Sequence, residues 1–439
     1  MTNVADAAPG PTQVAPPRSI RSMVAATEID IRLFGMLVAL GAIILIFNIL
    51  SGGTLFKPTN MVTLAVQATG IAIIATGMVL VIVSRNIDLS VGSLVGLVAM
   101  TYALLMTEWL PAIGLGADFP FRWAIALAIG IALGAAVGAL QGFIIAYVGV
   151  PSFIVTLGGL LTIRGVVWYL SSGAAVSGLD PNFQLIGGGA TGSIGGTLTW
   201  VAAGLGCLAI VWLLYTSRRQ RRRFHFQLRP MWAEVLIGVA GCVAVIAVAA
   251  FANANLWPQG LANRIAAEQG WGPAPEGGWQ IATGLPLPIV LLIGVTLVVT
   301  FIANRRQFGR YVYAYGGNPD AAELAGINTR RTILKTFVVM GILCALAAAV
   351  ASARLNGATL DVGQSYELYV IAAAVVGGTS FAGGIGTIPG AVLGAFVMQS
   401  LAYGLSFMGV NSPGQNVVAG IVLILAVAFD TWTRRRAAR

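Results

Sequence analysis

Long apolar stretches separated by short polar segments recur from residue 33 almost to the C-terminal end of the chain. An α-helix needs about 20 residues to cross a bilayer, and most of these stretches reach that length. The pattern predicts about twelve helices, near residues 33–50, 62–83, 89–106, 123–147, 153–170, 198–215, 232–251, 287–302, 333–353, 368–378, 388–408 and 417–432. The tenth stretch is short and interrupted by glycine. The prediction is therefore an all-α, polytopic integral membrane protein with about 10–12 transmembrane helices.

The composition agrees with this pattern. Hydrophobic residues make up 57% of the chain and charged residues only 9%, whereas a soluble domain carries about a quarter charged residues. Too few charges remain to cover a water-facing surface, so most of the surface must face lipid.

The positions of the basic residues predict an orientation. If the N-terminus lies in the cytoplasm and the spans alternate, 20 of the 25 Lys and Arg residues fall on the cytoplasmic side. Such a bias is the usual signature of topology, and it predicts that both termini are cytoplasmic. It also explains the net charge of +10 without a nucleic-acid partner.

The same orientation divides the chain into segments. Residues 1–30 are rich in Ala and Pro and predict a disordered cytoplasmic tail without a cleavable signal peptide. Residues 31–433 form the transmembrane domain, with a periplasmic loop at 253–286 and a cytoplasmic segment at 305–335. Residues 434–439 form a basic cytoplasmic tail.

The cytoplasmic segment contains one short helix with clear boundary signals. Asn318 suits the N-cap, Pro319 the first helical position and Gly326 a left-handed C-terminal cap. A helix this short is unstable alone in water, so it needs a surface on which to dock. Ala321, Leu324 and Ala325 would supply the apolar side of that contact.

Glycine recurs at intervals of four in several spans. Gly130, Gly134, Gly138 and Gly142 form one smooth helix face, and Gly386, Gly390 and Gly394 form another. Such faces favour close helix contact in lipid, and we expect the contacts to lie within one copy of the chain.

Two separated stretches share a pattern that predicts interrupted helices and a weak internal repeat. IVSRNIDLSVGSLVG and VVGGTSFAGGIGTIPGAVLGA each join an outside-to-inside span to an inside-to-outside span. Interrupted helices at matching positions of two halves often flank a transport pathway.

Few polar side chains lie at membrane depth, and they are the candidates for a translocation pathway. They are Asn86, Asp88, Ser90, Ser93, Gln141, Thr156, Arg164 and Asn356. Amide and hydroxyl groups can exchange hydrogen bonds with a neutral polyhydroxylated solute. The alternative is that these side chains hold helices together. Asp88 has two further alternatives, pairing with Arg85 or capping a helix that begins at Leu89.

The sequence shows no catalytic or metal-binding constellation. The cysteines Cys207, Cys242 and Cys344 lie in separate spans, and the single histidine, His225, lies in a basic loop. There is no phosphate-binding GxxxxGK[ST] motif, so this chain is not predicted to bind ATP in that way or to be an enzyme.

Four motifs in the same order resemble the permeases of the xylose-type sugar ABC importers, within the ribose and xylose permease family. They are GMVLVIVSRNIDLSVGS, VPSFIVTLGGLLTIRG, QFGRYVYAYGGNPDAAELAGI and VVGGTSFAGGIGTIPGAVLGAF. The resemblance covers almost everything from Val62 to Trp432. One departure is Ala325, where the family usually has Ser.

The resemblance implies a permease homodimer in the bacterial inner membrane, two ATPase subunits on the cytoplasmic face and a periplasmic sugar-binding protein. ATP and Mg²⁺ would bind to the ATPase, so this chain itself needs no cofactor. The short cytoplasmic helix corresponds to the family's coupling helix, which touches the ATPase. The predicted coupling residues are Gly317, Asn318, Ala321, Ala322, Glu323, Leu324, Gly326 and Ile327.

The predicted function is thus translocation of a monosaccharide, with xylose or a related pentose suggested by the resemblance. The alternative is a stand-alone secondary carrier or channel for a small neutral solute. A proton-driven carrier would need titratable carboxylates within its spans, and the predicted spans contain almost none.

Overall fold

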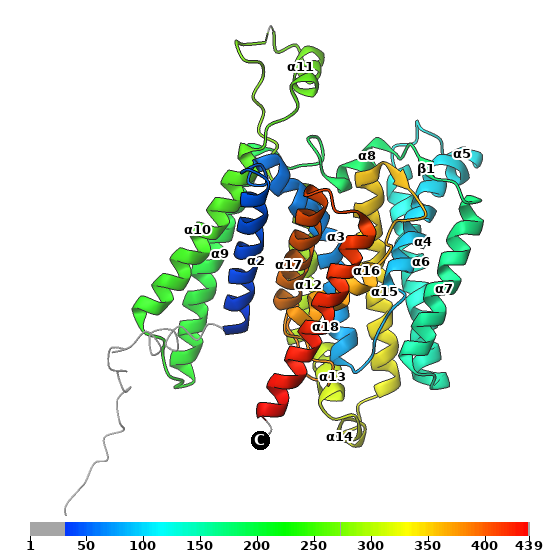
Figure 1. Cartoon of the computed structure of the whole chain (residues 1–439), viewed down its shortest axis with the longest axis vertical. Coiled ribbons are helices and arrows are strands. Elements are labelled where there is room, and N and C mark those ends of the chain that lie inside the picture. The colour runs from blue at the N-terminus through cyan, green and yellow to red at the C-terminus, as the bar shows by residue number, and fades with distance from the viewer. Residues whose placement is uncertain (1–30, 273, 438–439) are drawn as a thin grey trace, which may run out of the picture.

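The computed structural model describes residues 31–437 apart from residue 273, with side chains described from Leu33 to Ala428. The side chains of the predicted tails at 1–30 and 434–439 lie outside the described part of the chain. Helices run roughly side by side in one bundle, with α11 (Gln259–Glu268) projecting from one end and α14 (Pro319–Leu324) from the other (Figure 1). These two ends are called the α11 end and the α14 end below.

Ten helices within the described residues are long and apolar enough to cross a membrane. They are α2 (Ile31–Leu50), α3 (Pro58–Val83), α4 (Val91–Leu104, continued by η1 Leu105–Trp109 and α5 Leu110–Ala112), α6 (Arg122–Phe143, continued by η2 Ile144–Val148), α7 (Ser152–Ser171), α9 (Gly196–Arg223), α10 (Met231–Ala254), α12 (Leu287–Arg305), α15 (Thr329–Leu355) and α17 (Ile388–Phe407).

Two shorter apolar helices complete the set. They are α16 (Tyr366–Val376) and the apolar part of α18 (Ser412–Ala437). Each of the twelve predicted spans therefore coincides with a helix, and the glycine-interrupted tenth span is the short α16. The all-α polytopic fold predicted from the sequence is confirmed.

The remaining elements are small. α8 (Pro181–Gln184), η3 (Leu185–Gly187) and the strand pair β1 (Val176–Ser177) and β2 (Gly357–Ala358) lie toward the α11 end (Figure 1). α13 (Gln307–Gly317) leads directly into α14.

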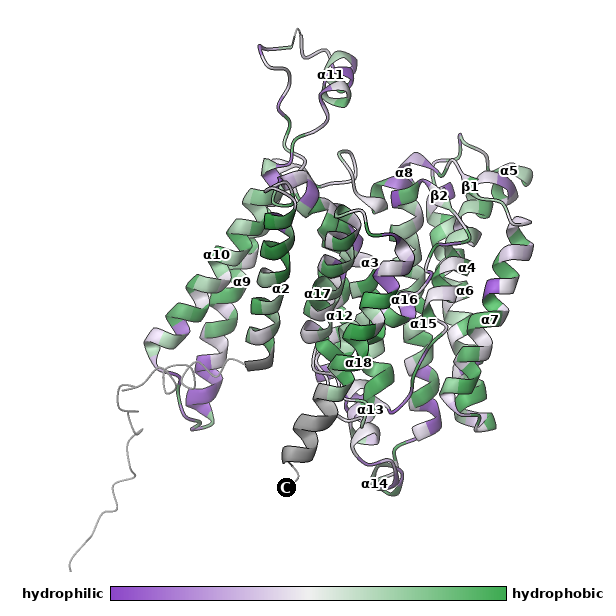
Figure 2. Ribbon diagram, viewed as in Figure 1, coloured by the Kyte–Doolittle hydropathy of each residue, from purple (hydrophilic) through white to green (hydrophobic). Residues whose placement is uncertain are grey.

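The helices divide into an inner and an outer group. In the most apolar stretch of each helix, 94% of the residues in α3 and 89% of those in α4 are buried, against only 11% in α9 and 11% in α10. The outer helices are nevertheless formed largely by hydrophobic residues (Figure 2), and many of these, such as Leu205 and Val239, are exposed. Because water would not tolerate such a surface, the outer group is built to contact lipid.

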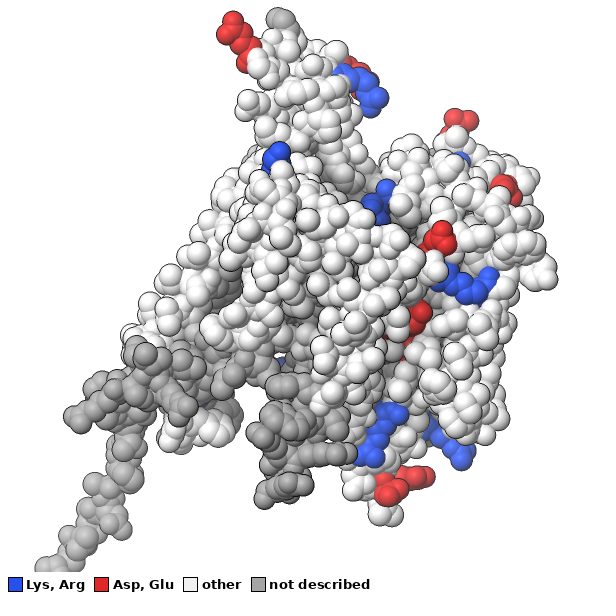
Figure 3. Space-filling model, viewed as in Figure 1, with Lys and Arg blue, Asp and Glu red and all other residues white. Residues whose placement is uncertain are grey.

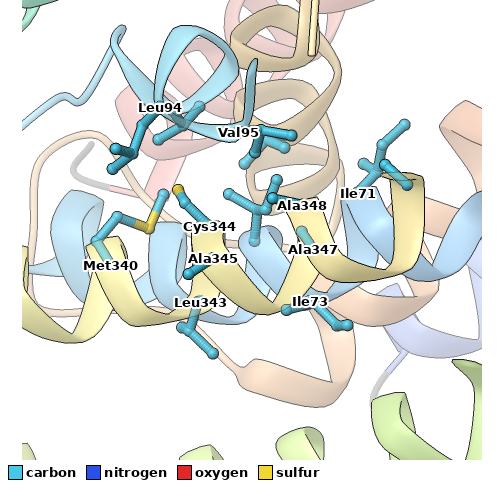
Figure 4. Packing of buried hydrophobic residues seen from close by; sticks show 14 of the residues in the cluster. Ile71, Ile73, Leu94, Val95, Met340, Leu343, Cys344, Ala345, Ala347 and Ala348 are labelled. Atoms are coloured by element: carbon cyan, nitrogen blue, oxygen red, sulfur yellow. The ribbon is translucent and has the colours of Figure 1, made fainter. Parts of the chain in front are cut away.

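The centre of the bundle is formed by α15 packed against α3, α4 and α6. Figure 4 shows Met340 and Cys344 of α15 directed toward Leu94 and Val95 of α4, with Ile73 of α3 on another side. An alanine-rich stretch of α15 also lies in this contact. Small side chains there allow the neighbouring helices to approach closely.

The glycine ladder of α6 packs against α15 within the same chain, as expected. A Cβ atom on Gly134 would lie 2.4 Å from the carbonyl oxygen of Gly341, and one on Gly138 would lie 2.2 Å from that of Phe337. The second ladder packs in the same way, because a Cβ on Gly394 would lie 2.1 Å from the carbonyl oxygen of Ala373 in α16. Backbone contacts this close require glycine at those positions.

Candidate functional site

The short helix α14 has the boundaries that the sequence predicts. The Asn318 side chain accepts a hydrogen bond from the backbone N–H of Ala321 (3.0 Å) and caps the helix. At the other end, the N–H of Ile327 donates to the carbonyl of Ala322 (3.1 Å), and Gly326 has a φ of 79°. Because this turn needs a left-handed residue, glycine at position 326 stops the helix.

The outward surface of α14 carries two exposed carboxylates as well as apolar side chains. Ala322 is buried on the bundle side, whereas Leu324 is 89% exposed. Ala321 and Ala325 are also exposed. A short, capped helix with an outward-facing leucine is well suited to dock in a groove on another protein.

α13 holds α14 against the bundle. Tyr313 donates a hydrogen bond from its hydroxyl to the carbonyl of Gly386 (2.8 Å). Gly316 sits so close to the end of α3 that a Cβ there would meet the Val83 carbonyl and the Gly384 N–H. Burial raises the pKa of the Tyr313 phenol, so it stays protonated and can donate.

The two repeat-like stretches meet where α13 packs against the end of α3. One connects α3 to α4 through residues 84–90, and the other connects α16 to α17 through residues 377–387. The N–H of Gly384 donates to the carbonyl of Val83 (3.0 Å), which joins the two connections directly. α13, and through it α14, therefore contacts both connections.

Neither alternative that the sequence allowed for Asp88 is correct. Arg85 does not pair with it: the guanidinium donates from Nε to the carbonyl of Gly316 (2.7 Å) and from Nη2 to that of Gly317 (2.9 Å). The following helix begins at Val91 rather than at Leu89. Asp88 instead accepts hydrogen bonds from the N–H (2.9 Å) and hydroxyl (2.7 Å) of Ser90, because a short carboxylate reaches the backbone two residues on.

A buried polar network surrounds the 84–90 connection. Gln141 donates a hydrogen bond from Nε2 to Ser90 Oγ (2.9 Å), which ties the connection to α6. Thr156 of α7 donates to the carbonyl of Ile87 (3.3 Å), and Ser93 donates to that of Leu160 (2.9 Å). These bonds join α4, α6 and α7.

Of the three remaining predicted pathway residues, one lies in the 84–90 connection and two lie away from it. Asn86 is buried and donates to the carbonyl of Ser84 (2.8 Å). Arg164 donates to the carbonyl of Leu360 (2.7 Å), and the side chain of Asn356 accepts from the N–H of Leu179 (2.9 Å). Both contacts lie outside the network, and Asn356 is exposed.

The structure thus brings Asn86, Asp88, Ser90, Ser93, Gln141 and Thr156 together around one connection. All of these side chains are buried and hydrogen-bonded within one copy of the chain. Their geometry fits a role in holding helices together, and their role in translocation stays a prediction. Sequence reasoning missed the contact of Arg85 with the end of α13 and that of Tyr313 in α13 with Gly386.

Gln141→Leu tests the structural side of this network. The change removes the hydrogen bond to Ser90, and we expect it to lower the free energy of unfolding by about 0.5–1.5 kcal/mol. Thermal unfolding in detergent measures the effect. Phe143→Leu, on an exposed position of the same helix, is the control and should leave the melting temperature unchanged. An unaltered melting temperature for both variants would contradict the structural role.

The part of the chain that the structure describes contains no cluster of three or more His, Cys, Asp or Glu side chains that could hold a metal ion. On the face shown in Figure 3, charged side chains lie at the two ends and in a band between them, and the remaining surface is uncharged. The chain belongs to the family described as branched-chain amino acid transport system / permease component, which matches residues 60–427.

Named relatives are permeases of sugar transport. The chain is 35% identical over 409 residues to the xylose transport system permease protein XylH of Escherichia coli (strain K12), covering 93% of this chain and 94% of the relative. It is 33% identical over 410 residues to the XylH protein of Haemophilus influenzae, covering 93% and 98%. Identity to the ribose import permease protein RbsC of Escherichia coli (strain K12) is 30% over 395 residues, covering 90% and 92%. No solved structure matches the chain.

These comparisons confirm the resemblance to xylose-type sugar permeases. As a member of a family of permease components, the chain is a multi-pass membrane transport subunit and not itself an enzyme.

Proposed function

We propose that the chain is the transmembrane subunit of an ATP-driven ABC importer that carries a monosaccharide across the bacterial inner membrane. Xylose or a related pentose is the proposed substrate. The observation that carries this proposal is the similarity to xylose permeases over 93% of the chain. The lower identity to the ribose permease favours xylose over ribose, which is also a pentose.

The proposed partner at the α14 end is a separate ATPase subunit that binds ATP and Mg²⁺. The exposed Leu324 and the capped ends of α14 support this contact, because both give a short helix a fixed shape and an apolar anchor. The proposed ATPase interface is therefore formed by the predicted coupling residues between Gly317 and Ile327.

The proposed orientation puts the α14 end in the cytoplasm. α9 ends in Arg221, Arg222 and Arg223, and α12 ends at Arg305, so the basic helix ends support a cytoplasmic location. The segment 253–286 at the α11 end would then face the periplasm. Its Trp271 and Trp279 rings lie 5.3 Å apart, and this aromatic pair is proposed to contact a sugar-binding protein.

We also propose that two copies of the chain form the pathway. The polar side chains around residues 84–90 are buried and bonded to one another inside one copy. A sugar pathway between two copies would leave these bonds in place.

Reconstitution tests the function. The purified chain, a candidate ATPase and a candidate binding protein are placed in liposomes, and ATP hydrolysis and uptake are measured with xylose, ribose and galactose. We expect xylose to stimulate both most strongly. Uptake by the chain alone, driven by a proton or sodium gradient, would contradict the proposal and support a secondary carrier.

Gly326→Val tests the coupling role of α14. No atom lies within 4 Å of a Cβ at this position, so the change acts only through the left-handed backbone, at a cost of about 1–2 kcal/mol. We expect roughly fivefold less sugar carried per ATP hydrolysed, with the bundle still folded. Gly326→Asn is the matched control, since asparagine tolerates this conformation and should retain most coupling. Equal coupling in both variants would contradict the assignment.

A further inference from the structure

The residue that links the α14 end to the interior of the bundle is Arg85. It lies two residues after the end of α3, and its backbone has a φ of 59°, in the left-handed region that non-glycine residues seldom adopt. Such a conformation persists only where surrounding contacts hold it. The contacts of the Arg85 side chain therefore indicate its role.

The guanidinium of Arg85 binds the last two carbonyls of α13. Nε donates to Gly316 (2.7 Å) and Nη2 donates to Gly317 (2.9 Å), so one planar group spans two successive peptides. The last carbonyls of a helix lack intrahelical partners and carry the negative end of its dipole. A rigid fork of N–H groups fits two such acceptors better than a single ammonium does. Asn318, the next residue, is the N-cap of α14.

The surrounding backbone is shaped around this side chain. A Cβ on Gly383 would lie 2.5 Å from Cγ of Arg85, so glycine at this position leaves room for the arginine stem. Gly384 donates its N–H to Val83, immediately before the Arg85 turn. The arginine thus lies where α13 and both interhelical connections meet.

The other side of the 84–90 connection is bound to the transmembrane helices. The Ile87 carbonyl accepts a hydrogen bond from Thr156 (3.3 Å), and the Ile87 N–H donates to Ser152 Oγ (3.2 Å), with both partners in α7. Ser90, just before α4, is bound to Gln141 of α6. A displacement of α13 would therefore pull through Arg85 on a short segment that is anchored to three helices.

We propose that Arg85 is a positioning residue that couples movement of α13 and α14 to α4, α6 and α7. The inference rests on the proposed function, because the movement is the one that an ATPase would impose on α14. Arg85 touches neither sugar nor nucleotide in this role. It carries displacement by holding two carbonyls of α13 in one bidentate contact.

The test compares Arg85→Ala, Arg85→Lys and Tyr313→Phe in the reconstituted assembly of permease, ATPase and binding protein. The measured quantity is xylose carried per ATP hydrolysed, together with the melting temperature of each permease. Arg85→Ala should lower the ratio about tenfold while ATP hydrolysis continues, and Arg85→Lys should restore part of it because lysine keeps one charged donor. Tyr313→Phe removes the hydrogen bond between α13 and Gly386 but leaves the Arg85 contact in place, so it should lower the ratio much less than Arg85→Ala does.

Each result separates this inference from the proposed function. Normal coupling in Arg85→Ala, or equal uncoupling in Tyr313→Phe, would overturn the inference while leaving the importer function intact. If Arg85→Ala fails to fold, full coupling in a folded Arg85→Lys variant would overturn it as well. A wild-type assembly without ATP-dependent uptake would overturn the proposed function, and the inference with it.

Discussion

Leu324→Asp is expected to abolish ATP-driven uptake almost completely. Leu324 is 89% exposed on a two-turn helix, and the proposed ATPase contact would bury it. A carboxylate there would have to lose its water without a partner, at a cost of several kcal/mol in the complex. We expect the ATPase to co-purify at least roughly a hundredfold less efficiently, since about 1.4 kcal/mol corresponds to each factor of ten.

The control for this change is Phe226→Asp. Phe226 is also an exposed apolar residue, 67% accessible, and lies in the connection between α9 and α10 at the same end of the bundle. The control should keep ATPase binding, and both variants should keep the melting temperature of the unmodified chain. Loss of binding in both variants, or in neither, would contradict α14 as the docking helix.

Gly134→Leu is expected to prevent correct folding or to destabilise the bundle by about 3 kcal/mol or more. The first added carbon would lie 2.4 Å from the carbonyl oxygen of Gly341 and 3.0 Å from the side chain of Ala345. Because the nearest obstacle is backbone, it cannot move aside as a flexible side chain could. α6 and α15 would have to separate along their contact.

Size-exclusion chromatography and thermal unfolding in detergent measure this effect. Ala136→Leu is the matched control, since Ala136 lies two residues further along α6 at an exposed position. The control should elute and unfold like the unmodified chain. A folded Gly134→Leu protein with an unchanged melting temperature would show that the close approach of α6 and α15 is not required.

Much of the fold follows from local patterns. The apolar stretches predicted each of the membrane helices, and a glycine-interrupted stretch correctly predicted the short α16. The boundaries of α14 were predictable because Asn318, Pro319 and Gly326 each satisfy a requirement of the neighbouring backbone. The glycine ladder on α6 predicted a close contact but did not name α15 as the partner.

The candidate site was predictable only in part. Six of the eight polar residues predicted to lie at membrane depth are buried in the bundle, but their hydrogen-bond partners could not be predicted from the sequence. Arg85 and Asp88 stand three residues apart and were candidates for a pair, yet Arg85 binds α13, which is 231 residues further along the chain. Residue spacing cannot reveal such a contact, because the partner carbonyls are brought beside Arg85 only by the packing of α13 against the end of α3.

The sequence by itself therefore determined which segments enter the membrane, where the short helix begins and ends, and which glycine faces pack closely. Those properties depend on the length, hydrophobicity and backbone preferences of neighbouring residues. Only the tertiary structure decided that α13, the 84–90 connection and the 377–387 connection meet, and that the buried polar side chains satisfy one another. The physical reason is that buried polar groups must find a hydrogen-bond partner, and the fold decides which distant partner comes within reach.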